Sequence, residues 1–151
     1  MQLSLHSEYS LRVLLYLATT SKPIVSTSDI SQAYGISKHH LVRVVQTLAE
    51  HEYVRVSAGR LGGIALATDP KNVKLGDVVR RAEPNFRMAE CFDKPKNTCI
   101  ITPVCSLKPV LREALDSFLA TLDRYTLADL LADGAGKRME SRLVSIGESA
   151  R

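Results

Sequence analysis

The chain has 151 residues, of which 45% are hydrophobic and 24% charged, and these proportions predict one ordinary domain or a small domain with an appendage. No apolar run approaches the ~20 residues that a membrane span requires, and the N-terminus lacks the basic start and cleavage site of a signal peptide. We therefore expect a cytoplasmic protein with no membrane partner. Tryptophan is absent and only 5% of the residues are aromatic, which argues against an aromatic-lined carbohydrate or base-stacking site.

Positive charge is concentrated in the N-terminal part of the chain. The net charge is +4, and residues 1–89 contain 11 basic and 7 acidic side chains, whereas residues 90–133 contain 5 basic and 7 acidic ones. A basic domain can face a polyanion such as nucleic acid. Ordinary surface scatter produces the same imbalance, so charge alone leaves this partner open.

The chain begins with the pattern of two short helices. Residues 7–19 are expected to form the first, with Ser7 as its N-cap. Its apolar face contains Leu11, Leu14, Leu15 and Ala18. A second helix is expected over 26–34, because it starts with a Ser-Thr-Ser-Asp sequence of capping-box spacing. Gly35 then permits a turn.

Residues 37–51 carry the strongest helical signal, with Ser37 as the N-cap. The apolar positions follow a helical period, and they are Leu41, Val44, Val45, Leu48 and Ala49. Two short helices joined by a glycine-containing turn are typical of a helix-turn-helix. The sequence therefore predicts that this helix is the recognition helix.

A β-hairpin is expected directly after that helix. Strands over 53–56 and 64–67 flank a glycine-rich tip that contains Arg60. A further helix over 75–83 is stopped by Pro84. Together these elements predict a mainly α fold with a small β-hairpin, in which residues 1–84 form a winged helix-turn-helix.

A recognition helix must offer hydrogen-bond donors to phosphates and base edges. The candidate DNA-binding residues of the third helix are Ser37, Lys38, His39, His40, Arg43 and Gln46. We expect Arg43 to contact guanine and Gln46 to read adenine. Arg60 sits where a wing enters a minor groove or touches phosphate. The alternatives are a solvated polar helix face and an exposed turn arginine.

Residues 85–108 are expected to be irregular, and they contain all three cysteines, Cys91, Cys99 and Cys105. A disulfide framework is not expected in the cytoplasm, especially with an odd number of cysteines. Three thiolates can surround an iron–sulfur cluster, which needs a fourth ligand from another residue, a neighbouring subunit or a small molecule. Buried structural cysteines, a zinc site and a thiol redox switch are the alternatives.

Residues 109–132 are expected to form a long helix, from Pro109 at its first position to about Tyr125, and one last short helix after it. The long helix carries a heptad-spaced seam of Leu111, Leu115, Phe118, Leu122 and Tyr125. We expect this seam to form a homodimer, and the alternative is that the helix packs on its own domain. Beyond it the pattern disappears, so residues 133–151 are expected to be a disordered tail.

The winged helix, the Arg-x-Gly-Gly wing, the clustered cysteines and the long helix resemble the family of bacterial iron–sulfur regulators that contains NsrR, IscR and RirA. The resemblance covers residues 1–132 and is most specific over 99–108 and 118–130, where the NsrR-type nitric-oxide-sensing repressors are most similar. It implies a [4Fe–4S] cluster held by Cys91, Cys99 and Cys105. It also implies that Glu8 is the fourth ligand, supplied by the other subunit of a homodimer.

The cluster alternatives are [2Fe–2S] and zinc. Lys108 stands where IscR-like proteins place a histidine ligand, which counts against an IscR-type [2Fe–2S] site.

The resemblance further implies a transcriptional repressor that binds a double-stranded palindromic operator. Nitric oxide would nitrosylate the cluster, release the DNA and derepress genes for nitric-oxide detoxification. The alternatives are an iron-responsive, RirA-like regulator and a zinc-stabilised DNA-binding module. An enzyme is not expected, because the sequence has no local Cys–His pair, no phosphate-cradling glycine loop and no carboxylate dyad.

Overall fold

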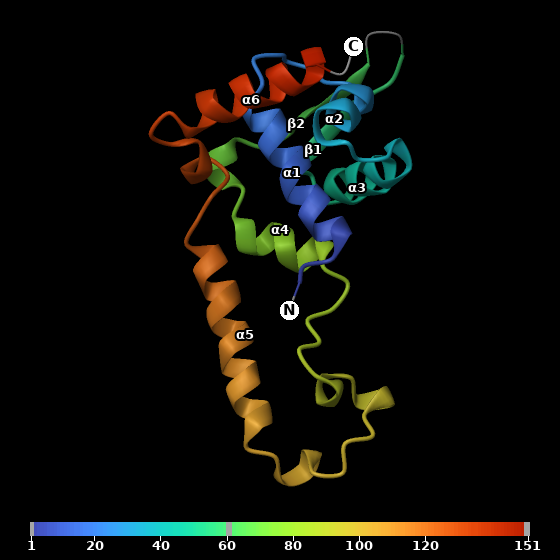
Figure 1. The fold of residues 1–151 in the computed structure, drawn as a ribbon, viewed down its shortest axis with the longest axis vertical. Coiled ribbons are helices and arrows are strands. Elements are labelled where there is room, and N and C mark those ends of the chain that lie inside the picture. The colour runs from blue at the N-terminus through green and yellow to red at the C-terminus, as the bar shows by residue number, and fades with distance from the viewer. Residues whose placement is uncertain (1, 60–61, 150–151) are drawn as a thin grey trace.

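The computed structural model describes residues 2–59 and 62–149 (Figure 1). The helices are α1 (Leu5–Thr19), α2 (Thr27–Tyr34), α3 (Lys38–Glu50), α4 (Leu75–Ala82), α5 (Leu107–Asp123) and α6 (Ala135–Ser149). The strands β1 (Val54–Ser57) and β2 (Gly63–Leu66) pair antiparallel. The predicted fold class, a mainly helical chain with a small hairpin, is confirmed. None of the helices in the described ranges is long and apolar enough to cross a bilayer.

The first helix begins earlier than the sequence analysis places it. Ser4, rather than Ser7, is the N-cap of α1, and its hydroxyl oxygen accepts the N–H of Ser7 at 3.2 Å. Ser7 is fully buried, and its own hydroxyl donates a hydrogen bond of 2.6 Å to the carboxylate of Glu83, which follows α4. The Ser7 side chain therefore has a tertiary partner, which the local sequence does not reveal.

The helix-turn-helix forms as predicted. Ser26 and Asp29 cap α2 reciprocally, because the Ser26 hydroxyl accepts the N–H of Asp29 and the Asp29 carboxylate accepts the N–H of Ser26, both at 3.1 Å. Gly35 then adopts a φ of 66°, which lies in the left-handed region that favours glycine. The Ser37 hydroxyl accepts the N–H of His40 at 3.4 Å, and α3 starts there.

The core lies between α1, α2, α3 and the hairpin. Its fully buried side chains include Leu14, Ile30, Leu41, Leu48 and Ile64. Burial of this apolar surface is the main stabilising contribution to the domain. On α1 the inward stripe is Val13, Leu14 and Leu17, and the predicted Leu11, Leu15 and Ala18 are only partly buried beside it.

The hairpin is tied to the segment that precedes α2. Val25 and Ile64 exchange backbone hydrogen bonds of 2.9 and 2.7 Å. A Cβ at Gly63 would lie 2.6 Å from the carbonyl oxygen of Val25, so only glycine fits this approach. The wing is therefore held against the start of the helix-turn-helix and not only by its own two paired strands.

The long helix α5 is anchored to the domain at its C-terminal end (Figure 1). Arg80 of α4 donates two hydrogen bonds of 2.6 Å to the carboxylate of Asp123. A Cβ at Gly76 would lie 1.9 Å from that carboxylate, so the glycine makes room for the pair. Just after α5, the N–H of Leu127 donates to the carbonyl of Val73 at 2.8 Å, and the Leu127 side chain is 1% exposed.

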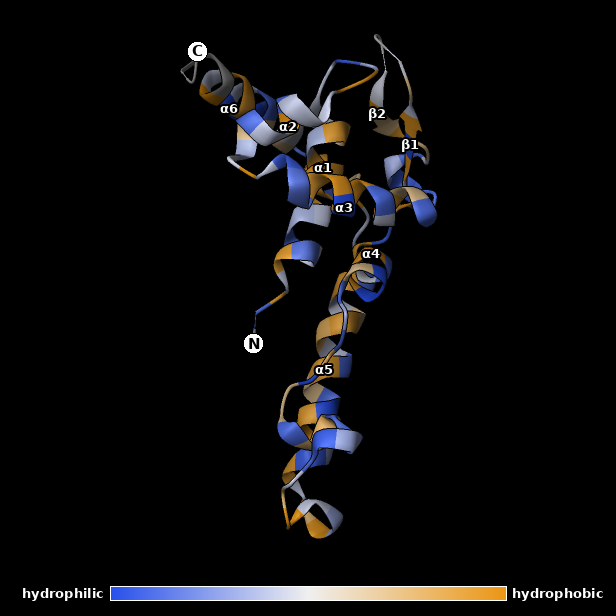
Figure 2. Cartoon of the chain, turned by 90° about the vertical axis from the view of Figure 1, so that its right-hand side faces the viewer, coloured by the Kyte–Doolittle hydropathy of each residue, from blue (hydrophilic) through white to orange (hydrophobic). Residues whose placement is uncertain are grey.

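α5 starts at Leu107, two residues before the predicted start. Pro109 still lies in the first turn, where a missing N–H costs no helical hydrogen bond. The N-terminal half of α5 and the loop that precedes it extend away from the body formed by α1–α4. Apolar residues are visible along both (Figure 2).

The predicted heptad seam is not free in this chain. Leu115 is buried at 3% exposure and lies with Phe118 beside the segment that follows α4. Leu111 and Leu122 are half-buried, and Tyr125 is 47% exposed. The seam thus packs partly on its own domain, as the alternative interpretation expects. Large apolar side chains are instead exposed on a strip, here called the free apolar strip, formed by Ile100, Ile101, Val104, Leu107 and Val110.

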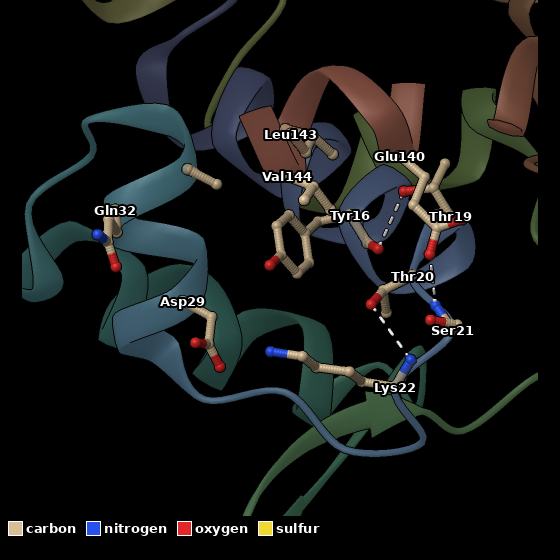
Figure 3. Close-up of a pocket in the computed structure, with 11 residues that line it drawn as sticks. Tyr16, Thr19, Thr20, Ser21, Lys22, Asp29, Gln32, Glu140, Leu143 and Val144 are labelled. Carbon is tan, nitrogen blue, oxygen red and sulfur yellow. Dashed lines mark hydrogen bonds between the residues drawn. The ribbon is translucent and has the colours of Figure 1, made fainter. Parts of the chain in front are cut away.

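The C-terminal segment differs from the disordered tail that the sequence analysis expects. Residues 135–149 form α6, which lies across α1 and α2 (Figure 1). The Glu140 carboxylate accepts the N–H of Ser21 at 2.9 Å. A cavity of about 230 Å³ lies at this junction, with Tyr16, Lys22 and Glu140 among its lining residues (Figure 3). Helices in proteins are stabilised mainly by tertiary contacts. The local sequence pattern of residues 135–149 is therefore a weak indicator of their helical structure.

We expect Ser26→Ala to lower the free energy of unfolding by about 1 kcal/mol, because it removes the capping hydroxyl of α2. Ser28→Ala is the matched control, since Ser28 is exposed inside the same helix, and its effect should stay within about 0.5 kcal/mol. Urea denaturation followed by circular dichroism measures both. Equal effects of the two substitutions would contradict the capping role.

Candidate DNA interface and cysteine loop

The outward face of α3 is basic and exposed. The predicted DNA-binding residues are exposed along it, and they are Lys38, His39, His40, Arg43 and Gln46, with Ser37 exposed at the N-cap. The acidic residue of α3, Glu50, lies at its C-terminal end. Positive charge therefore gathers on the first two turns, which is where recognition helices meet bases and phosphates.

His40 is turned towards α1 more than its neighbours. Its ring lies 6.0 Å from that of Tyr9, and with Arg43 it borders a hollow of about 220 Å³ between α1 and α3. The His39 ring is exposed and its centroid lies 6.1 Å from that of His40. The structure thus groups Lys38 and His39 on the open face and gives His40 an additional contact with the neighbouring helix.

The wing adds a basic residue that the sequence analysis does not select. Arg55 of β1 is exposed, and its guanidinium donates to the carbonyl of Leu66 at 3.1 Å. A cation at an outward strand position next to a recognition helix is the signal that would have found it. The predicted wing residue Arg60 lies outside the described residues. The wing tip before it is shaped by Gly59, with a φ of 96°.

The three predicted cluster ligands lie on the loop between α4 and α5. Cys91 and Cys105 are half-buried, Cys99 is exposed, and all three thiols are free. Short 3₁₀ turns are the regular structure of this loop, at Glu90–Phe92, Lys94–Lys96 and Thr102–Val104. Within residues 2–59 and 62–149, no three His, Cys, Asp or Glu side chains lie close enough to hold a metal ion. The thiols share one loop but do not converge in the single chain.

Hydrogen bonds already draw parts of this loop together. The Glu90 carboxylate accepts the hydroxyl of Thr98 at 2.8 Å and also its backbone N–H. These two donors lower the pKa of Glu90 below its ordinary value. Asn97 accepts the N–H of Cys99 at 3.3 Å and donates to the Thr102 hydroxyl at 3.0 Å. The residue before Cys91 is thereby held next to the residue before Cys99.

Two further contacts fix the Cys91 side of the loop. The guanidinium of Arg112 lies over the ring of Phe92, 4.8 Å from its centroid, which connects α5 to the loop. The carboxylate of Asp93, only 8% exposed, pairs with Arg87 at 2.7 Å. Sequence reasoning missed Glu90, Arg112 and Asp93, because their partners lie several residues to twenty residues away and carry no motif.

The donor set fits an iron–sulfur cluster in its chemistry. Thiolates are the usual ligands of such clusters, and the three thiols are free, stand on one loop and are half-buried or exposed. This chain supplies three donors on the loop, so a fourth must come from elsewhere. Glu8, the predicted fourth ligand, lies in the first turn of α1, where its carboxylate pairs with Arg12.

The first turn of α1 is clamped to the end of α4. The Glu83 carboxylate accepts the N–H of Ser4 at 2.9 Å and the hydroxyl of Ser7 at 2.6 Å. Glu83 immediately precedes Pro84, where the segment leading to the cysteine loop begins. The helix that carries Glu8 and the base of the cysteine loop are therefore held by one carboxylate.

The same turn of α1 also contacts the recognition helix. His6 Nε2 and the hydroxyl oxygen of Thr47 in α3 lie 3.1 Å apart and share a hydrogen bond. Together with the Tyr9–His40 ring contact, this hydrogen bond connects α1 to α3 on both sides of Glu8. A displacement of the start of α1 would therefore reach the DNA-facing helix directly.

Comparison with known sequences identifies the family of this winged helix. A family model described as "Rrf2: Iron-dependent Transcriptional regulator" matches residues 3–133. The chain belongs to the Rrf2 family. The "HTH-type transcriptional regulator NsrR" of Bacillus subtilis (strain 168) is 48% identical over 132 residues, which cover 87% of this chain and 90% of that protein. The protein of the same name from Geobacillus kaustophilus (strain HTA426) is 47% identical over 139 residues, 91% and 95% of the two chains.

Solved structures of this Rrf2 family have the same architecture. T. potens IscR is 25% identical and superimposes with a TM-score of 0.69 over 88% of each chain. CymR of B. subtilis, described as the global cysteine regulator, is 25% identical with a TM-score of 0.64 over 86% and 95% of the two chains. The NsrR relatives are named transcriptional regulators, not enzymes, so this chain is a DNA-binding transcriptional regulator of the Rrf2 family and resembles NsrR. α6 begins after the last residue that the family model matches.

We expect Ser7→Ala to lower the free energy of unfolding by about 1.5–3 kcal/mol, because a buried hydroxyl that donates to a carboxylate is lost. Ser10→Ala is the matched control. Ser10 is equally buried, but its hydroxyl donates to a helical carbonyl, that of His6, so the cost should stay near or below about 1 kcal/mol. Urea unfolding of the apo-proteins gives both values. Equal losses would show that the hydrogen bond from Ser7 to Glu83 contributes no more than an ordinary one.

We expect Arg43→Ala to weaken binding of a duplex selected from a random DNA library by about tenfold or more, because a basic contact of the recognition helix is lost. Arg124→Ala removes the same charge from the end of α5 and should leave affinity nearly unchanged. Fluorescence anisotropy measures affinity, and circular dichroism checks the fold. An unchanged affinity of the Arg43 variant would take this residue out of the interface.

Proposed function

We propose that this regulator is a homodimeric repressor that senses nitric oxide through a [4Fe–4S] cluster. In this proposal Cys91, Cys99 and Cys105 of one subunit hold the cluster and Glu8 of the other subunit completes the ligand set. Loss of the cluster releases a palindromic operator and derepresses genes for nitric-oxide detoxification.

The observation that carries the proposal is the position of the three free thiols on one unburied loop next to α5. Cysteines kept only for packing would be expected inside the core, whereas Cys99 is exposed and the other two are half-buried. The high identity to proteins named NsrR supports the same assignment.

A bound iron–sulfur cluster supplies thiolate-ligated iron that reacts with nitric oxide. The residues of this chain have the remaining tasks. The cysteine thiolates bind the cluster, and Glu90 and Asn97 position the backbone next to Cys91 and Cys99. Glu83 keeps the start of α1 at a fixed place relative to the base of the loop.

Release of DNA follows from the contacts between α1 and α3. When Glu8 is no longer held by the neighbouring subunit, the start of α1 is free to shift, and the His6–Thr47 hydrogen bond transmits the shift to α3. In a dimer the two recognition helices must fit half-sites about one DNA turn apart. A small displacement of each α3 changes this separation and weakens binding to both half-sites.

The free apolar strip is the surface that we assign to the dimer. Its five side chains are between 56% and 92% exposed in the single chain, with Ile100 the most exposed. Exposed apolar groups of this extent are typical of protein–protein contacts. A dimer formed there brings the cysteine loop of one subunit towards its neighbour, which the shared ligand set requires.

An iron-responsive regulator is the second candidate, because the matching family model is described as an iron-dependent transcriptional regulator. It uses the same ligands and differs in the signal. A regulator of this kind releases DNA when iron is withdrawn and does not respond to nitric oxide while iron is present.

The deciding experiment is an anaerobic titration of freshly purified full-length protein with nitric oxide, followed by visible absorbance and by DNA affinity. We expect a coloured protein that loses its absorbance and its affinity at a few nitric oxide molecules per cluster. A coloured protein that responds only to iron chelators would establish the iron-responsive function instead. A protein that stays colourless after cluster reconstitution, with or without bound zinc, would overturn the iron–sulfur assignment.

We expect Glu8→Ala to accelerate loss of the cluster absorbance and to alter the nitric-oxide response, because one ligand is removed. Arg12→Ala is the matched control, since it breaks the same Glu8–Arg12 ion pair but keeps the carboxylate. The control should retain the wild-type spectrum and decay rate. If both variants behave like the wild type, Glu8 is not a ligand, and if both are impaired alike, the ion pair rather than ligation is responsible.

A further inference from the structure

An apolar groove separates the recognition helix from the wing. Its volume is about 370 Å³, and its apolar walls are formed by Val42, Val45 and Ala49 of α3 and by Val56 and Ile64 of the hairpin. Among the residues of the groove that the structure describes, none has an ionisable side chain. The described walls of the groove are therefore apolar and offer no cation to a phosphate.

Two of these apolar side chains are largely exposed to solvent. Val42 is 48% exposed and Val56 is 58% exposed. Gln46 lines the same groove, and Val42 stands four residues after Lys38 on α3, so the groove borders the predicted DNA-facing surface. An apolar side chain at such a position gains free energy only when a partner covers it.

The chemistry of duplex DNA leaves one apolar group for this position. In the major groove the base edges present hydrogen-bond donors and acceptors, and the only apolar feature among them is the 5-methyl group of thymine. We infer that the groove receives a thymine methyl group and that Val42 is a specificity-determining residue for A·T pairs in the operator.

Gln46 supports this assignment from the same helix face. It stands four residues after Val42, so the two side chains are neighbours on α3, and Gln46 also borders the groove. A glutamine amide donates to N7 and accepts from N6 of adenine. Val42 and Gln46 therefore read the two partners of A·T base pairs, the methyl group through an apolar contact and the purine through hydrogen bonds.

The inference rests on the DNA-binding part of the proposed function and is independent of the cluster and of nitric oxide. The probe is a duplex selected by the purified full-length protein from a random library. Each thymine of a half-site is replaced in turn by deoxyuridine, which removes the methyl group and leaves base pairing intact. Affinity is measured by fluorescence anisotropy for the wild type and for Val42→Ala.

We expect the wild type to lose about threefold to tenfold in affinity at one or two thymine positions of each half-site, the size that burial of one methyl group predicts. Val42→Ala should bind the thymine duplex about as weakly as the wild type binds the deoxyuridine duplex, and it should not distinguish the two. Val144→Ala is the matched control, because it shortens an equally exposed valine on α6. It should discriminate like the wild type.

Several results would overturn the inference. The wild type could bind every deoxyuridine duplex as tightly as the thymine duplex, or Val42→Ala could retain the full discrimination. A change in the oligomeric state of Val42→Ala in analytical ultracentrifugation would assign the groove to a protein contact instead. If Arg43→Ala keeps its affinity for the selected duplex, the DNA-facing role of α3 fails as well. If Arg43→Ala loses affinity but methyl discrimination is absent, only the role of Val42 fails.

Discussion

The one-sided attachment of α5 determines how the rest of this protein is arranged. Arg80, Asp123 and Leu127 hold its C-terminal end against the winged helix, and the opposite end extends away from the body (Figure 2). The cysteine loop precedes that opposite end, so it projects away from the core. Thiols in this position are available to a small group and to a second subunit, which a loop folded back on the domain would prevent.

The first turn of α1 lies at the meeting point of the two functional regions. Glu83 holds it to the base of the cysteine loop, and the His6–Thr47 hydrogen bond holds it to the recognition helix. These contacts involve a short run of residues around Glu8. A change at Glu8, the proposed ligand, therefore has a direct path to the predicted DNA-facing surface of α3. The path consists of packed and hydrogen-bonded groups.

Local signals in the sequence account for most of the DNA-binding domain. Ser26, Asp29, Gly35 and Ser37 act within three or four residues of their partners, so their capping and turn patterns can be identified without a structure. The exposed basic face of α3 follows from the same helical period. The candidate cluster ligands are different, because their selection depends on residue type and family resemblance.

Several of the features that sequence reasoning missed depend on distant partners. Serine is a typical N-cap residue, but the hydroxyl of Ser7 donates its hydrogen bond to Glu83, 76 residues away. The heptad-spaced positions of α5 predict a helix seam without saying which surface covers it, and Leu115 is covered by its own chain. The helical α6 depends on contacts such as that between Glu140 and Ser21, 119 residues apart. Tertiary partners of this kind leave no periodic trace in the sequence.

An element fixed at one end is mechanically a lever. Because Leu115 is buried against the domain, the free arm of α5 runs from Leu107 to Leu115, which at ~1.5 Å per residue is about 12 Å. Over such an arm, a movement of about 2 Å at the far end corresponds to a rotation of about 10° at the hinge. The α4–α5 ion pair can remain intact through a rotation of that size. The protein can thus convert a local rearrangement around its thiols into a change of angle at the domain without unfolding any helix.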